Sequence, residues 1–228
     1  MSDERKKPKM PELFEAFFCI AYLLFDLVAA VVFFSHRSDH KVFLLYGILT
    51  AVLGIGDAFH LVPRIGKAFF GERAHTQWWL GLGLCVSSIT MTFFYVLLFC
   101  IWRLLFEAVA VPAFLSVLLL VTAAVRVILC LFPQNHWFEK EGNPLWSKLR
   151  NAPFVVTGLC MMTFFCLSGN TGGYGLWKMA IAIFISFACY IPVTLYAKQK
   201  PMIGMLMIPK TVAYIWMICM GLRLLTLL

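Results

Sequence analysis

Long runs of apolar residues, separated by short polar segments, dominate the sequence. Seven of these runs are long enough to cross the ~30 Å hydrocarbon core of a bilayer as helices. They cover residues 12–34, 42–61, 78–102, 108–133, 153–168, 175–197 and 203–225. The connections between them are too short to hold a second domain. The pattern therefore predicts an all-α fold: a basic N-terminal tail over residues 1–11, then a single polytopic membrane domain over 12–228 that forms a seven-transmembrane-helix bundle.

The composition supports a membrane protein. Hydrophobic residues make up 62% of the chain and charged residues only 13%, whereas a soluble domain is nearer half apolar and a quarter charged. All eight cysteines fall in apolar segments without the spacing of metal ligands. We therefore interpret them as small hydrophobic residues, and we expect neither a metal nor another cofactor.

Lysine and arginine residues are unevenly distributed between the two sides of the predicted bundle. With the N-terminus in the cytoplasm, that side carries twelve of them and the opposite side five. The positive-inside rule then predicts a cytoplasmic N-terminus and an external C-terminus. The net charge of +8 follows from this distribution, so it indicates attraction to anionic membrane lipids rather than nucleic-acid binding.

Five ionisable residues lie inside the predicted spans rather than at their ends. They are Asp26, Asp57, His60, Arg126 and Lys210. Such groups are costly to place in a membrane and often mark functional sites. The predicted spans place Asp57, Arg126 and Lys210 within ~6 Å of each other in depth, at 1.5 Å per residue.

The segment GIGDAFHLVPR (54–64) continues this polar pattern along one helix. His60 follows Asp57 by one turn on the same face, and Arg64 follows by another turn. We expect Pro63 to help end the helix and the glycines to let a neighbouring helix approach closely. The polar groups could neutralise each other as buried ion pairs, or Asp57 and His60 could perform acid–base chemistry.

Serine and threonine residues on the third span could line a cavity near these ionisable groups. They are Ser87, Ser88, Thr90 and Thr92. Such side chains usually bond backbone carbonyls or permit close helix packing.

The segments LLYGILTAVLGIGDAFHLVPR (44–64) and MTFFYVLLF (91–99) resemble the YhhN-type lysoplasmalogenase-like membrane proteins. Gly56, Asp57, Pro63 and Arg64 match the family's Gly-Asp and Pro-Arg pairs, and Tyr95 matches its tyrosine on the following helix. The resemblance implies hydrolysis of the vinyl-ether bond of a lysoplasmalogen-like lipid, with Asp57 as the acid. It also implies a bacterial plasma membrane.

These observations predict a site with two groups of residues. The predicted catalytic residues are Asp57 and His60. The predicted substrate-binding residues are Lys210, Arg126, Arg64, Asp26, Tyr95, Tyr190 and Tyr214. The expected partners are membrane lipids and a lipid or small amphiphilic ligand.

Two other functions fit parts of the sequence. The family's second acid falls near residues 188–194, and this chain has ACYIPVT there, without an acid. That difference favours the alternative of a non-catalytic seven-helix binder or carrier of a lipid or small amphiphile. A lysine in the seventh span, Lys210, is also typical of retinal proteins, but the third span has no acid to serve as a counter-ion.

Overall fold

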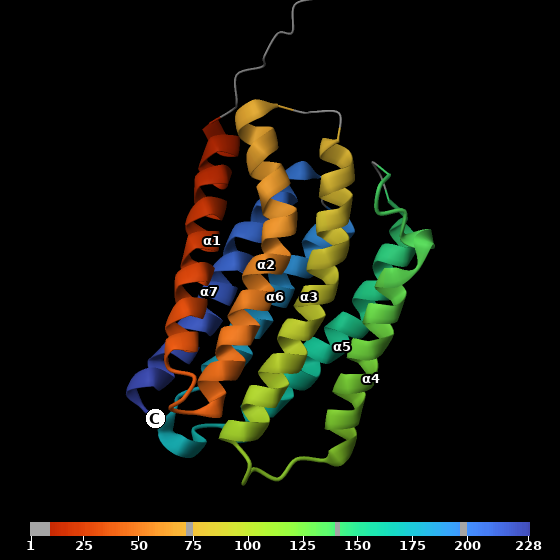
Figure 1. Ribbon diagram of the computed structural model, residues 1–228. Coiled ribbons are helices and arrows are strands. Elements are labelled where there is room, and N and C mark those ends of the chain that lie inside the picture. Colours follow the sequence, from red (N-terminus) through yellow and green to blue (C-terminus); the bar gives the residue numbers. More distant parts are fainter. Residues whose placement is uncertain (1–9, 72–74, 140–141, 197–199) are drawn as a thin grey trace, which may run out of the picture.

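The computed structural model describes residues 10–71, 75–139, 142–196 and 200–228. Seven long helices make up most of this part of the chain (Figure 1). They are α1 (Met10–Ser35), α2 (Lys41–Phe70), α3 (Thr76–Leu105), α4 (Ala113–Leu131), α5 (Pro144–Ser168), α6 (Lys178–Tyr196) and α7 (Met207–Arg223). Short 3-10 turns lie at Pro133–Asn135 (η1), Thr171–Gly173 (η2), Pro201–Leu206 (η3) and Leu224–Thr226 (η4). Every long helix lies in a segment apolar and long enough to cross a membrane, which confirms the all-α, multi-pass fold.

The helices follow each other around the bundle in chain order. Each helix contacts the next along the chain, and α7 closes the ring by contacting α1. Helix α2 also reaches α7 across the interior. The beginning of α1 and the C-terminus lie at opposite ends of the bundle (Figure 1). We call the end at which α1 begins the N-terminal end of the bundle.

Two helices differ clearly from the predicted spans. Helix α2 continues through Pro63 to Phe70, so the prediction that this proline helps end the helix is wrong. A proline removes one backbone hydrogen bond, and neighbouring helices in a membrane bundle compensate for that loss. Helix α5 begins at Pro144, nine residues before the predicted start, because Asn143 Oδ1 accepts hydrogen bonds from the first backbone N–H groups.

The other ends move by fewer residues. Helix α4 begins at Ala113, directly after Pro112, rather than at residue 108. The last predicted span, 203–225, divides into η3, α7 and η4. Proline residues lie at or near several of these changes, and they interrupt the helical hydrogen bonding without interrupting the apolar pattern.

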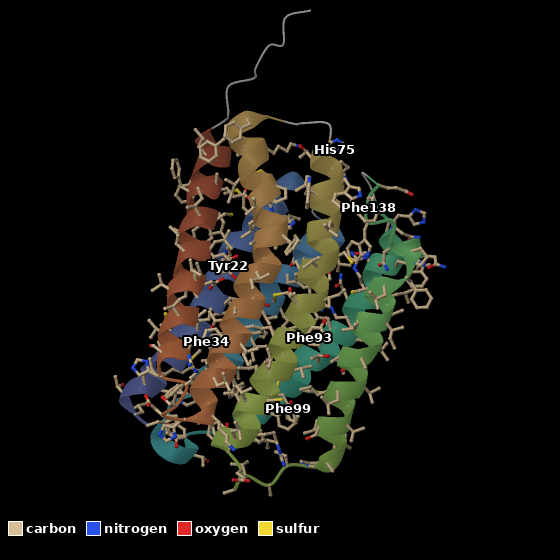
Figure 2. The ribbon with its side chains drawn as sticks, in the orientation of Figure 1. Tyr22, Phe34, His75, Phe93, Phe99 and Phe138 are labelled. Carbon is tan, nitrogen blue, oxygen red and sulfur yellow. The ribbon has the colours of Figure 1, made fainter. Side chains whose placement is uncertain are left out.

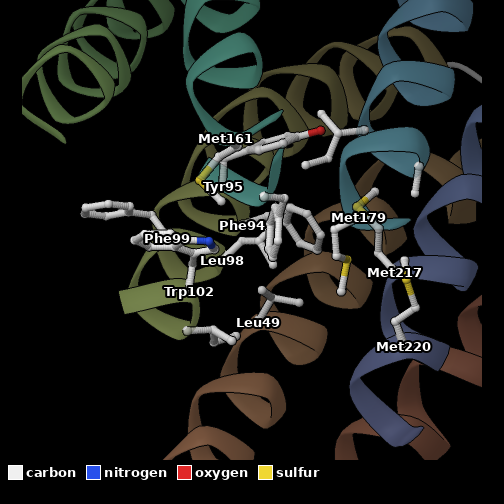
Figure 3. Packing of buried hydrophobic residues seen from close by; sticks show 14 of the residues in the cluster. Leu49, Phe94, Tyr95, Leu98, Phe99, Trp102, Met161, Met179, Met217 and Met220 are labelled. Atoms are coloured by element: carbon white, nitrogen blue, oxygen red, sulfur yellow. The ribbon is translucent and has the colours of Figure 1, made fainter. Parts of the chain in front are cut away.

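The largest hydrophobic cluster fills the half of the bundle opposite the N-terminal end. Aromatic side chains form its centre: Trp102 lies 4.9 Å from Phe164 between ring centroids, and Phe99 lies 5.1 Å from the same ring. Methionines of α5, α6 and α7 belong to the same cluster (Figure 3). Tyr95 contributes its ring to this cluster and directs its hydroxyl away from Trp102 (Figure 3).

Glycines bring α2 and α3 into close contact, as the sequence predicts. A Cβ atom at Gly56 would overlap the Thr90 side chain, and one at Gly83 would overlap the backbone of Phe59 and His60. Small residues allow such an approach between membrane helices. The approach fixes α3 against the part of α2 that carries Asp57.

We predict that Gly56→Ala lowers the stability of the protein by about 1–3 kcal/mol, because the added methyl group overpacks the α2–α3 contact. Thermal unfolding of the purified protein, followed by tryptophan fluorescence, measures the change. Gly66→Ala on the same helix is the matched control, since among the described residues nothing beyond its own stretch of helix lies within 4 Å of a Cβ at Gly66. Equal unfolding temperatures for the two variants would contradict the prediction.

Candidate functional site

The Asp57 carboxylate receives hydrogen bonds from two neighbouring helices. The Tyr22 hydroxyl of α1 donates to Oδ2 at 2.8 Å, and Ser87 Oγ of α3 donates to Oδ1 at 3.4 Å. Tyr22 is buried about half-way along the bundle, where α1 and α2 lie side by side (Figure 2). Two donors therefore hold Asp57 in a fixed orientation inside the bundle.

A second carboxyl group, that of Asp26, lies beside the first. Asp26 follows Tyr22 by one turn of α1, and its charge interacts with that of Asp57. Its side chain is 1% exposed, and within the described residues neither carboxyl oxygen has a hydrogen-bond partner. Gly54 of α2 leaves room for it, because a Cβ there would lie 3.0 Å from Asp26 Cβ. The two acids and Tyr22 form one polar group. We call Asp57 and Asp26 the carboxyl pair.

His60 and Arg64 lie further toward the N-terminal end of α2. In the described part of the chain, no hydrogen bond joins His60 to Asp57, and His60 Nδ1 is buried without a partner. The Arg64 guanidinium forms an ion pair with Glu15 of α1. The structure therefore links Asp57 to Tyr22 and Ser87, whereas Arg64 connects α2 to α1 nearer the N-terminal end of the bundle.

Lys210 enters the interior from α7 and is 8% exposed. Its charge interacts with the opposite charge of Asp57 and with the like charge of Arg126. The ammonium nitrogen lies 5.1 Å from the ring centroid of Tyr214 and 5.3 Å from that of Tyr190. Lys210 thus connects the carboxyl pair to a second, positively charged region.

Arg126 of α4 is the other cation of this region. It is 1% exposed, and its Cζ lies 3.3 Å from the centroid of the Phe154 ring on α5. Its Nε and Nη1 atoms have no hydrogen-bond partner among the residues that the structure describes. Stacking on an aromatic ring contributes roughly 0.5–2 kcal/mol, whereas removing an ion from water costs several kcal/mol. The Phe154 ring alone therefore offsets only part of the free-energy cost of burying the guanidinium.

Three hydroxyl groups lie near the two cations. The hydroxyl oxygens of Tyr95 and Tyr214 are 3.5 Å apart, and the buried Ser186 of α6 lies beside both. Tyr95 also lies within reach of the Arg126 charge. We call Arg126, Lys210 and these three hydroxyl residues the cationic chamber. Its members are rich in hydrogen-bond donors.

Tyr190 separates the cationic chamber from a cavity between α5 and α6. Its ring lies near Lys210, and its hydroxyl donates a hydrogen bond of 2.8 Å to Asn151 Oδ1. Both residues also line the cavity, whose volume is about 150 Å³. Ser147, Lys148 and Thr194 contribute further polar groups to its wall.

Some of these groups could be anticipated from the sequence and some could not. Ser88, Thr90 and Thr92 bond backbone carbonyl oxygens of α3, as predicted, whereas Ser87 reaches Asp57. The role of Tyr22 was missed, although its spacing of four residues from Asp26 was a usable signal. Phe154 gave no signal, because a phenylalanine in an apolar helix is unremarkable before its neighbours are known.

No ligand set for a metal ion is present in the described ranges, where no three His, Cys, Asp or Glu side chains lie close enough together. In comparisons with protein-family models, with curated proteins and with solved structures, no match to this chain was found.

We predict that Tyr22→Phe lowers the stability by about 1–2 kcal/mol, because the partly buried Asp57 carboxylate loses a hydrogen-bond donor. In an Asp57→Leu background the same substitution should cost less, since the hydroxyl then has only the Asp26 carboxyl beside it. Chemical or thermal unfolding of the four proteins measures this coupling. Tyr196→Phe, on a half-exposed tyrosine, is the control; equal costs of Tyr22→Phe in the two backgrounds would show that the hydrogen bond is not stabilising.

Proposed function

We propose that this protein is a membrane-embedded lipid hydrolase that cleaves the vinyl-ether bond of lysoplasmalogen-like lipids, in a plasma membrane of bacterial type. The observation that carries the proposal is the carboxyl pair inside the bundle, in which Tyr22 and Ser87 orient Asp57 and the buried Asp26 lies alongside. The resemblance of residues 44–64 and 91–99 to lysoplasmalogenase-like proteins supports it. Asp26, on α1, also offers a second acid that the segment 188–194 lacks.

The chemistry requires a proton donor and a base close to each other. Tyr22 first passes a proton from Asp26 to the Asp57 carboxylate, and the Asp57 carboxylic acid adds this proton to the vinyl carbon farther from the ether oxygen, which leaves an oxocarbenium ion. The resulting carboxylate stabilises this cation. Water then adds to the cationic carbon and gives up a proton to Asp26. The hemiacetal breaks down into an aldehyde and the alcohol of the glycerol backbone.

The other groups support these steps. Tyr22 lies beside both carboxyl groups, so its hydroxyl can pass a proton between them. Ser87 keeps the Asp57 carboxyl in one orientation. His60 lies one turn away without a hydrogen bond to Asp57 within the described chain, so we assign the acid role to Asp57 and no proton transfer to His60.

The second candidate is a non-catalytic binder or carrier of a lipid or small amphiphile. It would use the same interior groups, and the absence of an acid in residues 188–194 favours it. Stoichiometric lipid that co-purifies with the protein and is never turned over would support this function.

Purified protein incubated with a lysoplasmalogen should release aldehyde. Asp57→Asn should reduce the rate at least about a hundredfold, because general acid catalysis contributes roughly 10²–10⁴-fold. Ser87→Ala should retain part of the activity, because it removes only the longer hydrogen bond to Asp57.

Asp39→Asn is the matched control, since it removes an exposed acid outside the interior. An ester lysolipid of the same chain length tests whether the reaction depends on the vinyl ether. If the wild type releases no aldehyde, the hydrolase proposal fails and the carrier remains.

A further inference from the structure

We propose that the cationic chamber is a binding site for a phosphate group, carried on an amphiphile that enters between α5 and α6. This inference deepens the proposed function by naming a group that the substrate carries, and it rests on that function only for the bond that reacts. The juxtaposition that carries it is a buried guanidinium and a buried ammonium with three hydroxyl groups around them.

The hydrogen-bonding capacity of the buried Arg126 guanidinium is only partly used. Buried polar groups in proteins are nearly always paired, yet Nε and Nη1 of this guanidinium have no partner in the described part of the chain. These two N–H groups lie on different edges of the guanidinium, so each can donate to its own oxygen of an anion that lies against Arg126. Stacking on Phe154 holds the guanidinium plane without using these donors.

Other hydrogen-bond donors lie near the Arg126 guanidinium. They come from three different helices, α3, α6 and α7, and their hydroxyl groups lie close together. Lys210 supplies a second positive charge, and the hydroxyls of Tyr95, Tyr214 and Ser186 can each donate a hydrogen bond. A phosphate has more acceptor oxygens than a carboxylate, and donors from several directions suit it better.

The cavity between α5 and α6 offers a phosphate group a route of entry. The cavity between α5 and α6 has a volume of about 150 Å³. A cavity of roughly this size can hold a benzene molecule, so a phosphate group fits. Tyr190 stands between this cavity and Lys210 and is held by its hydrogen bond to Asn151. A rotation of the Tyr190 side chain would connect the cavity with the cationic chamber.

The test uses the full-length protein in dodecyl maltoside micelles, which contain no phosphate. Binding of dodecyl phosphate and of inorganic phosphate is measured by calorimetry and by the shift in unfolding temperature. Wild-type protein should bind dodecyl phosphate, and Arg126→Met should bind it at least tenfold more weakly while unfolding at the same temperature as the wild type or higher. Arg103→Met, which removes an exposed arginine of α3, should bind like the wild type.

Arg126→Lys covers the case in which Arg126→Met does not fold. This variant keeps the charge but loses the fixed planar array of guanidinium N–H donors, so it should bind several-fold more weakly. Tighter binding of dodecyl phosphate than of inorganic phosphate assigns the site to a lipid headgroup, whereas equal binding assigns it to free phosphate. The proposal is overturned if neither probe binds, or if the folded Arg126 variants bind as tightly as the wild type.

Two further variants separate this inference from the hydrolase and test the route. Asp57→Asn should lose aldehyde release but still bind dodecyl phosphate, so binding without hydrolysis would refute only the proposed reaction. Thr194→Trp fills the cavity and should slow the association of dodecyl phosphate at least fivefold, with its final affinity little changed. An unchanged association rate would refute entry between α5 and α6.

Discussion

The hydrogen bonds that Asp57 accepts from Tyr22 and Ser87 are the interaction on which the interior arrangement depends. A carboxylate inside an apolar bundle has no water to bind, so its partners must come from neighbouring helices. These two bonds tie α1 and α3 to α2. Lys210 adds α7 to the same group through its charge. Four helices thus meet at a single side chain.

The glycines of α2 and α3 make this meeting possible. Gly56 precedes Asp57 directly, and Gly83 lies one helical turn before Ser87. Both glycines allow the helices to approach until side chain or backbone atoms would touch a Cβ. The close approach therefore brings Ser87 within reach of the carboxylate. Packing and polar chemistry are coupled here, because a wider spacing would leave Asp57 with fewer partners.

Hydropathy predicted the seven helices well, because the need to bury backbone polar groups in a membrane leaves helices as the simplest solution. Helical rise also placed Asp57, Arg126 and Lys210 at similar depth, and their charges interact as a chain through Lys210. The end of α2 was not predicted, because a proline such as Pro63 can end a helix or lie within it. The partners of Asp57 were not predicted either, since hydropathy does not say which helices are neighbours or which faces meet.

The two cations differ from ordinary buried ion pairs in how they are held. In a close ion pair, each charge cancels the other and both lose their attraction for a ligand. Arg126 rests on Phe154 and Lys210 lies near two tyrosine rings, and an aromatic face orients a cation while leaving its N–H donors free. The hydrophobic cluster, which fills the half of the bundle opposite the N-terminal end, supplies the folding free energy that such an arrangement needs. The bundle can therefore maintain two incompletely neutralised cations beside two carboxyl groups, which is the combination that binding and cleaving a charged lipid would require.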